Sequence, residues 1–466
     1  MKISFHGAAR TVTGSKHLLQ LDNGKKILLD CGMFQGMGKK TIELNNHWGF
    51  NPIEVDYLVV SHAHIDHIGL IPKLYKDGFR GTIFCTNTTY ELAEIMLEDS
   101  AVIQRDDTKY YNKKRAKQGL PLYEPMYTLE DAKACLENFS SQNYRQWFKV
   151  CDEVECFYSD AGHIIGSACV HLKITENNKT THITFSGDVG RYKDDVLKSP
   201  ETFPQADYIL MESTYGNKLH DEVISSADVF LDWIEKTCIQ KKGNLIIPAF
   251  SLGRTQTLLL LLNQLELENR LPNIPVFVDS PLSMETTKVV KAHPENYNNR
   301  LKKILESDKD PFDFKGLKFI QNADESKQLN NLNRPCIIIS ASGMADAGRI
   351  KHHIKNNILD PKNTILFVGY CEPHSLGGRL GNGVKEVRIF GEELKVKAEV
   401  GQMRSMSAHG DFDDLCQWLF CQNPKLVKKL FLVHGEYDVM ADFSSRLIRK
   451  GFDVEMPNMH ESFELV

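Results

Sequence analysis

The segment at residues 61–67, SHAHIDH, constrains this chain more than any other. Three histidines and one aspartate fall within six residues, directly after the apolar run DYLVV, which predicts a buried strand. His62 and His64 are two residues apart, so an extended loop would aim both imidazoles to one side. A following turn would direct Asp66 and His67 to a second metal position. The usual separation of the ions in two-metal sites is about 3.5–4 Å. The pattern therefore predicts a metal-binding loop at a strand end; a cluster of surface histidines is the alternative.

Imidazole and carboxylate ligands suit Zn²⁺, with Mn²⁺ or Fe as other options. Two such metals need about seven or eight ligands, so the remainder must come from elsewhere in the chain. His163 in AGHIIGS, Asp188 in SGDVG and His434 in VHGE each occupy a turn or a strand end beside glycine. A carboxylate can bridge two ions, whereas a neutral imidazole cannot. Taken alone, each residue is ambiguous, because either histidine could be a hydrogen-bonded core residue and Asp188 a turn residue.

Composition limits the class of protein. The chain has 466 residues with 42% apolar and 25% charged residues, typical of a soluble globular protein. Its net charge of −5 disfavours nucleic-acid binding through bulk charge but allows a local basic groove. No apolar run approaches the ~20 residues of a membrane span, and the N-terminus lacks a signal-peptide h-region. The 11 cysteines include no CxxC pair, which favours free thiols in a reducing cytoplasm.

The order of predicted elements indicates two kinds of module. The runs at 17–21 and 26–30 flank Asp22-Asn23-Gly24 and predict a hairpin, and a helix is expected near 89–104, with Thr88 and Glu91 at capping-box spacing. After residue 215, apolar runs at 245–247, 276–279, 336–339 and 365–368 alternate with helical segments, which predicts a parallel α/β sheet. Residues 391–466 return to strand-rich sequence. We therefore expect a middle α/β module, residues 216–390, inserted between residues 1–215 and 391–466.

A polar stretch covers residues 105–150 and contains the basic run KKRAK at 113–117. A solvated helical face is the simpler interpretation of this run. A contact with a phosphate backbone is the alternative.

The motifs HAHIDH, AGHIIGS and SGDVG, in this order after LLDCG, resemble the metal motifs of the metallo-β-lactamase superfamily. ESTYG at 212–216, SMSAH at 405–409 and VHGE at 433–436 resemble the three additional motifs of its β-CASP branch. Further matches, including GAARTVTGS, DCGMFQG, IPAFSLGR and SASGM, extend over nearly the whole chain. The resemblance implies an α/β fold, in which a β-CASP cap with a parallel sheet is inserted into an αββα metallo-β-lactamase sandwich.

The resemblance also implies roles for individual residues. One metal would be held by His62, His64 and His163 and the other by Asp66, His67 and His434, with Asp188 bridging two Zn²⁺ ions. Asp30 would orient a ligand or a water molecule. Glu212 would orient His409, and His409 would act as the general acid. His434 stands where the DNA-repair members commonly have an apolar residue, so the chain looks like the RNA-processing type.

The expected function is therefore a zinc-dependent ribonuclease that cleaves single-stranded RNA through a dinuclear metal-bound hydroxide, and the resemblance implies an endonuclease. It would leave 5′-phosphate and 3′-hydroxyl ends. Glycine-rich turns at Ser342 and Gly343, together with Arg254, Arg349 and Arg379, are candidate phosphate contacts; ordinary turns and solvated arginines are the alternative. A homodimer is compatible with the sequence. A DNA nuclease or another hydrolase of the same fold remains open as the runner-up, and a scaffold without activity is disfavoured because no ligand is missing. The sequence contains no GxSxG, GxxxxGK[ST] or GxGxxG motif.

Overall fold

The computed structural model describes residues 1–220, 225–332 and 334–466, which form two compact units. Unit 1 contains Met1–Gln35, Lys39–Leu219 and His409–Val466, and unit 2 contains Gly36–Gly38 and His220–Ala408. Sequence analysis places the return to the first module at residue 391. The structure instead keeps residues 391–408 in unit 2, because the strand at Glu399–Gln402 pairs with the sheet of that unit.

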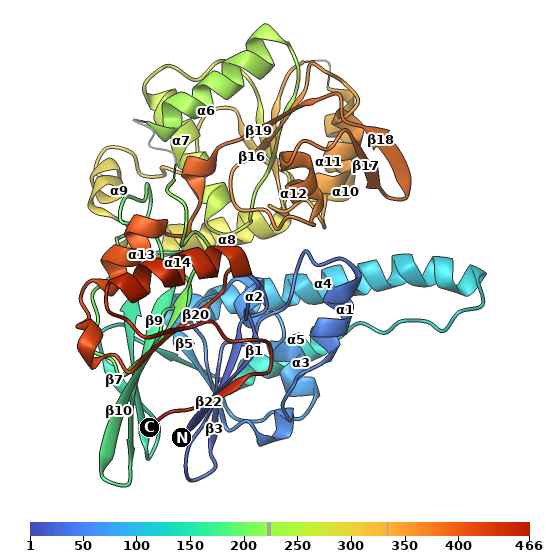
Figure 1. Ribbon diagram of the computed structural model, residues 1–466. Helices are drawn as coiled ribbons and strands as arrows, with labels where there is room; N and C mark the ends of the chain where they lie inside the picture. Colours follow the sequence, from blue (N-terminus) through green and yellow to red (C-terminus); the bar gives the residue numbers. More distant parts are fainter. Residues whose placement is uncertain (221–224, 333) are drawn as a thin grey trace. The chain divides into compact units, whose positions relative to one another are not determined.

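Unit 1 is built on two seven-stranded sheets (Figure 1). The first sheet has the order β22 (Ser462–Glu464), β1 (Lys2–Gly7), β2 (Lys16–Gln20), β3 (Lys26–Leu29), β4 (Tyr57–Val59), β5 (Thr82–Thr86) and β6 (Phe139–Gln142). The second has the order β21 (Val454–Glu455), β20 (Lys429–Val433), β11 (Tyr208–Glu212), β10 (Lys179–Phe185), β9 (Ala168–Glu176), β8 (Val154–Asp160) and β7 (Trp147–Cys151).

The two sheets pack face to face through alternate side chains of their strands. Ile3, Leu19 and Ile27 of the first sheet share one buried core with Leu172 and Phe185 of the second. The side-chain period of two along each strand aims one set of apolar residues into this layer. The predicted hairpin is confirmed, since β2 and β3 pair in antiparallel register around the turn.

Helices cover the outer faces, which completes the expected αββα sandwich. Helices α13 (Phe412–Leu419) and α14 (Tyr437–Arg449) contribute Trp418 and Phe443 to a second core, against Ile209 of β11. Figure 1 shows α3 (Ile71–Lys76), α4 (Asn87–Lys117) and α5 (Leu129–Cys135) on the other side of the unit, together with the short helices α1 (Lys39–Asn46) and α2 (Ile65–Ile68).

Unit 2 contains a six-stranded parallel sheet, as the alternation of apolar runs and helices predicts. Its order is β14 (Leu317–Phe319), β13 (Val276–Val278), β15 (Ile337–Ser340), β12 (Leu245–Pro248), β16 (Thr364–Phe367) and β19 (Glu399–Gln402). Its helices are α6 (Ser226–Ile234), α7 (Arg254–Leu267), α8 (Pro281–Ala292), α9 (Asn299–Ile304), α10 (Ala323–Gln328), α11 (Ile350–Asn357) and α12 (Leu376–Gly381), and β17 (Glu386–Ile389) and β18 (Glu392–Lys395) form a separate hairpin.

Helix α4 is the largest difference from the predicted elements. The expected helix at 89–104 exists, but it begins at Asn87 and continues to Lys117. Its cap is Thr86, whose hydroxyl accepts the Thr89 amide, and not the predicted Thr88. The helix continues because residues 105–117 contain neither glycine nor proline, and it ends just before Gly119, which adopts a φ of 66°. Within the described residues, no helix is both long and apolar enough to cross a bilayer.

Candidate metal centre

The predicted site residues of unit 1 gather at one edge of the sandwich because several strands end there. Asp30 follows β3, His62 follows β4, Asp188 follows β10 and His434 follows β20. Strands β3 and β4 are parallel, as are β10, β11 and β20. Parallel strands present their carboxyl ends at a common edge, where polar loops can converge. His163 reaches the same edge from the loop before β9, which runs antiparallel to β10.

The loop after β4 has the shape that its sequence predicts. Residue 64 caps α2 with extended backbone, φ −67° and ψ 147°, so His62 and His64 precede the helix. Their Nε2 and Nδ1 atoms lie 3.2 Å apart. Asp66 and His67 lie in the first turn of α2 and are thereby turned to a different point.

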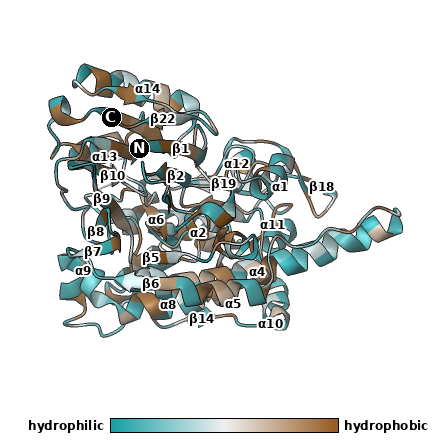
Figure 2. Cartoon of the chain, turned by 90° about the horizontal axis from the view of Figure 1, so that it is seen from below, coloured by the Kyte–Doolittle hydropathy of each residue, from teal (hydrophilic) through white to brown (hydrophobic). Residues whose placement is uncertain are grey.

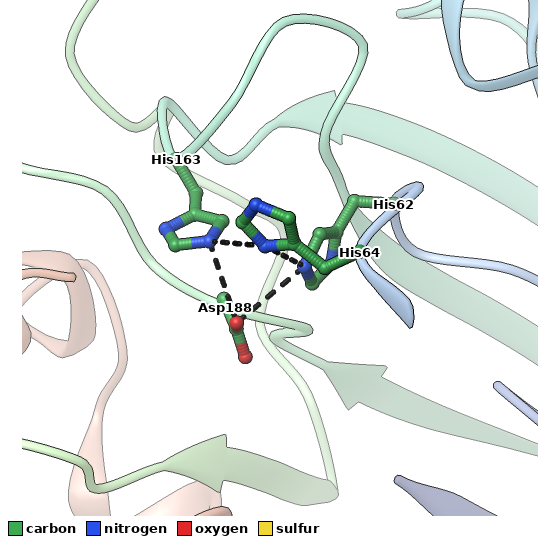
Figure 3. Close-up of side chains that lie close together, drawn as sticks. All are labelled: His62, His64, His163 and Asp188. Carbon is green, nitrogen blue, oxygen red and sulfur yellow. Dashed lines mark hydrogen bonds and ion pairs between the residues drawn. The ribbon is translucent and has the colours of Figure 1, made fainter. Parts of the chain in front are cut away.

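Four ligand atoms form the first cluster, shown in Figure 3. His64 Nδ1 lies 3.2 Å from His62 Nε2 and 3.2 Å from His163 Nε2. Asp188 Oδ2 lies 3.4 Å from each of the same two Nε2 atoms. A tetrahedral zinc ion with bonds of about 2.0–2.1 Å requires donor atoms about 3.3–3.4 Å apart. The cluster therefore fits one zinc ion.

The second cluster contains Asp66, His67 and His434. The two imidazole Nε2 atoms lie 3.3 Å apart, and Asp66 Oδ2 lies 3.5 Å from His434 Nε2 and 4.0 Å from His67 Nε2. Asp188 Oδ1 lies 3.3 Å from His67 Nε2 and 3.6 Å from His434 Nε2. Asp188 thus directs one oxygen to each cluster, and Oδ1 is buried without a hydrogen-bond partner. This geometry fits a second cation and a shared carboxylate.

Charge and burial prepare these groups to bind cations. Burial lowers the pKa of His62 to about 3 and that of His64 to about 4, so both rings are neutral at pH 7, as ligands must be. Burial acts to raise the pKa of Asp188, but the surrounding histidines, His434 first, hold it well below its usual value. Burial acts to lower the pKa of His67, but Asp188 and Asp30 raise it well above its usual value. Cation binding at this ring would therefore displace a proton.

Asp30 occupies the position expected for an orienting group. Its Oδ2 atom lies 2.6 Å from His67 Nδ1, and its Oδ1 atom accepts the Ser61 amide at 2.7 Å. A carboxylate on Nδ1 directs Nε2 of the same ring toward the cluster. Asp30 itself adopts a φ of 58°, which turns the chain sharply after β3.

Two further orienting residues were not predicted. The Ser61 hydroxyl lies 2.8 Å from Asp30 Oδ2 and 3.0 Å from His62 Nδ1, so it links two predicted site residues. The Thr214 hydroxyl lies 3.0 Å from His434 Nδ1 and donates to the His434 carbonyl at 3.1 Å. Ser61 directly precedes His62, and Thr214 lies two residues after Glu212. Their positions within the recognised motifs were the available signal.

The buried Glu212 and the partly buried His409 form a pair beside the first cluster. His409 Nδ1 lies 3.2 Å from Glu212 Oε1 and 3.8 Å from Asp188 Oδ2. Burial acts to lower the pKa of His409, but the Glu212 and Asp188 carboxylates outweigh it and raise the pKa to about 9. The ring is therefore protonated at neutral pH, as a general acid requires. Asp188, Glu212, His409 and His434 also lie close enough to hold an ion, which is the alternative arrangement.

The five predicted substrate contacts all lie in unit 2. Arg254 is buried at the start of α7, Ser342 and Gly343 follow β15, and Arg379 is half-buried in α12. The Arg349 guanidinium pairs with Asp279 at 2.7 Å and donates to the carbonyl groups of residues 320 and 321. These contacts hold the Arg349 guanidinium within unit 2, and its expected phosphate contact stays a prediction.

Three family models match the chain. They are the metallo-beta-lactamase superfamily at residues 14–236, the Beta-Casp domain at 255–380 and the Zn-dependent metallo-hydrolase RNA specificity domain at 393–457. The chain is similar to Ribonuclease TTHA0252 of Thermus thermophilus, with 34% identity over 99% of both chains. It is also similar to an RNase J-like protein of Methanocaldococcus jannaschii, with 30% identity over 93% of this chain and 92% of that protein. A third relative, the transcription termination factor FttA of Methanosarcina mazei, is 28% identical over 97% of this chain and 69% of its own length.

Proposed function

Because the chain belongs to the β-CASP branch of the metallo-β-lactamase superfamily, we propose that it is a zinc-dependent ribonuclease that hydrolyses phosphodiester bonds of single-stranded RNA. The observation that carries the proposal is the pair of ligand clusters that share Asp188, with the Glu212–His409 pair beside them. The RNA substrate is further supported by the match at residues 393–457 and by the similarity to a ribonuclease of Thermus thermophilus.

In this proposal, seven side chains hold two zinc ions. His62, His64 and His163 hold one; Asp66, His67 and His434 hold the other; Asp188 is shared. The chemistry that such a pair supplies when bound is a lower pKa for water and neutralisation of negative charge on the phosphodiester. The histidines and carboxylates of the chain would hold the cations at one place relative to His409, because the rings of His67, His62 and His434 are oriented by Asp30, Ser61 and Thr214.

In this proposal, His409 acts on the leaving group. Hydrolysis joins a water oxygen to phosphorus and breaks the bond from phosphorus to the 3′ oxygen, which must gain a proton. We assign that proton to the His409 imidazolium, and Glu212 holds the ring through Nδ1. The products are then a 5′-phosphate and a 3′-hydroxyl. General acid catalysis of this kind contributes about 10²–10⁴-fold to rate.

Cleavage of a 5′-labelled single-stranded RNA, beside DNA of the same sequence, tests the proposal. The reactions contain added Zn²⁺ or Mn²⁺, a chelator control, and a parallel preparation of the H62A/H64A variant to detect contaminating nuclease. We expect RNA cleavage that needs metal and that leaves ends a ligase can rejoin. Product length separates internal from end-directed cutting. Equal cleavage of DNA would favour the alternative of a DNA nuclease, and activity that resists the chelator would overturn the metal assignment.

A further inference from the structure

The distal part of α4 and the segment that follows it project from unit 1 as an arm, residues 102–126 (Figure 1). The last buried residue of α4 is Ala101, and none of the residues from 102 to 126 is buried. A helix that lies outside the core gains no stability from apolar packing of its own face. This length of exposed helix therefore calls for a role other than support of the core.

The arm has a defined structure. The Asn112 amide donates to the Tyr123 carbonyl at 2.8 Å, and the Tyr123 amide donates back to the Asn112 side chain at 2.9 Å. The Arg115 guanidinium lies 4.0 Å above the Tyr123 ring and donates to the Pro121 carbonyl at 2.5 Å. The returning segment thus packs on the Asn112–Arg115 side of the helix.

The opposite side of the helix is basic and carries an aromatic ring. Residues 109–123 contain five basic residues and no acidic one, in a chain whose net charge is −5. At about 100° per residue, one arc of about 140° collects Lys109, Tyr110, Lys113, Lys114 and Lys117. Tyr110 is 57% exposed. Within the described residues, Lys113, Lys114 and Lys117 have no ion-pair partner, whereas Lys109 lies 4.0 Å from Asp106. In Figure 2 this end of α4 is largely hydrophilic.

The other end of α4 is attached to the metal centre. The hydroxyl groups of Thr86 and Thr89 both donate to the Gly166 carbonyl, at 2.6 and 2.9 Å, in the loop that carries His163. At 1.5 Å per residue, Lys113 lies about 36 Å along the helix from Thr89. The helix therefore holds its basic arc at a fixed distance from the site.

We propose that this arc binds the backbone of single-stranded RNA outside the metal centre, with the lysines on phosphates and Tyr110 stacked on a base. The proposal rests on the proposed ribonuclease function for the identity of the nucleic acid. A second copy of the chain is the rival occupant. Charge argues against it, because a symmetric contact would place two lysine-rich arcs together, and residues 109–117 contain no leucine, isoleucine or valine.

The length of the helix between the metal centre and the arc sets a minimum length for an RNA that contacts both. A stacked strand rises about 3.4 Å per nucleotide, so about eleven nucleotides are needed to span the 36 Å of helix between Thr89 and Lys113. An RNA of four nucleotides in the centre cannot reach the arc, whereas one of twenty can.

The test compares the full metal-loaded chain with its K113A/K114A/K117A variant. The matched controls are K113R/K114R/K117R, which keeps the charge, and K149A/K179A/K425A, which removes three exposed lysines elsewhere in unit 1. Binding is measured by fluorescence anisotropy with a labelled 20-nucleotide phosphorothioate RNA, recovered intact on a gel, across a range of salt concentrations. We expect the alanine variant alone to lose roughly 10–100-fold in affinity at 0.1 M salt. The slope of log affinity against log salt should fall by about 2, at about 0.7 per lost phosphate contact.

Kinetics separate this inference from the proposed function. If both hold, the alanine variant has a higher KM on a 20-nucleotide RNA and unchanged kcat/KM on a 4-nucleotide RNA, and Y110A behaves in the same direction. Unchanged affinity and salt slope in the alanine variant would overturn the role of the arm while leaving the ribonuclease intact. A change in the sedimentation mass of the alanine variant would also overturn the role of the arm in RNA binding, and it would indicate that the arc contacts a second copy of the chain. If the wild type binds RNA through the arm but cleaves none, the proposed function fails and the arm stands.

Discussion

The Nδ1 atom of His409 lies 3.2 Å from Oε1 of Glu212, and that oxygen also accepts the Val189 amide at 2.6 Å. Val189 directly follows Asp188, so one carboxylate oxygen connects the His409 ring to the backbone of the proposed bridging ligand. Residues of unit 1 position the His409 ring, and His409 is not one of the seven proposed metal ligands. Its proposed role can therefore be separated experimentally from metal binding.

Substitution of His409 by alanine should leave both metals in place and lower turnover by about 10²–10⁴-fold, because the leaving oxygen loses its proton donor. Metal content by mass spectrometry and single-turnover RNA cleavage measure the two effects. H47A, which removes an exposed histidine of unit 1, is the control. Loss of one metal equivalent in H409A would show that His409 is a ligand, as the alternative cluster with Glu212 allows.

Substitution of Glu212 by glutamine should move the alkaline limit of activity to lower pH. Burial lowers the pKa of His409, whereas Glu212 and Asp188 raise it to about 9. A general acid works below its pKa, so activity is lost as pH rises through that value. Bound cations would lower the limit below 9, since positive charge disfavours the imidazolium. Removing the Glu212 charge lowers the alkaline limit of activity further. Coincident pH–rate profiles for E212Q and the wild type would contradict this role.

Substitution of Thr214 by valine should weaken one metal and not the other. The Thr214 hydroxyl donates its hydrogen to the His434 carbonyl, so its oxygen accepts a hydrogen bond from Nδ1–H, and Nε2 is left as the ligand atom. Loss of such an orienting group typically costs 10–100-fold in metal affinity. Titration against a chromophoric chelator should show a two-step release in T214V. T214S keeps the hydroxyl and should match the wild type; equal weakening in T214S would point to packing instead.

Lys16 predicts a pH dependence of stability. Its ammonium group is fully buried beside the carbonyl groups of Gly14 and Gly32, and burial lowers its pKa from 10.5 to about 7. Between these values the unfolded chain binds the proton and the folded chain does not, so the free energy of unfolding rises with pH. The rise amounts to at most a few kcal/mol, at about 1.4 kcal/mol per pKa unit.

Thermal unfolding of K16M and wild type, both in chelator, checks this sign. The midpoint of the wild type should rise relative to that of K16M from pH 7 toward pH 10, because only the wild type contains the buried amine that the folded chain holds unprotonated. A difference that is constant over this range would mean that Lys16 titrates normally in the folded chain.

The sequence identifies the site more completely than it identifies the elements around it. Metal motifs depend on residue type at short spacing, so His62, His64 and Asp66 could be predicted from one loop. The convergence of His163, Asp188 and His434 on that loop depends on strand order, which local sequence does not encode. The resemblance to a family supplied it. The arrangement of Gly187 depends on the same packing: its φ is 54°, and a Cβ atom there would lie 2.7 Å from Ser61 Cβ.

Two features could not be predicted from hydrophobic patterning. The C-terminal half of α4 has no apolar periodicity, because it packs on no core; only the basic run at 113–117 indicated a solvated helical face, which the structure confirms. Arg349 follows a glycine-rich turn, which favoured a phosphate contact, and its guanidinium pairs with the buried Asp279, which directly follows β13. Such partners become visible only once the sheet of unit 2 is assembled.

The central claim is that seven side chains of unit 1 hold two cations with Asp188 between them. Crystals of the zinc-loaded chain, measured above and below the zinc absorption edge, test it most directly. We expect two anomalous peaks about 3.5–4 Å apart, one beside His62, His64 and His163, the other beside Asp66, His67 and His434. A single peak, or a peak coordinated by His409 and Glu212, would contradict it.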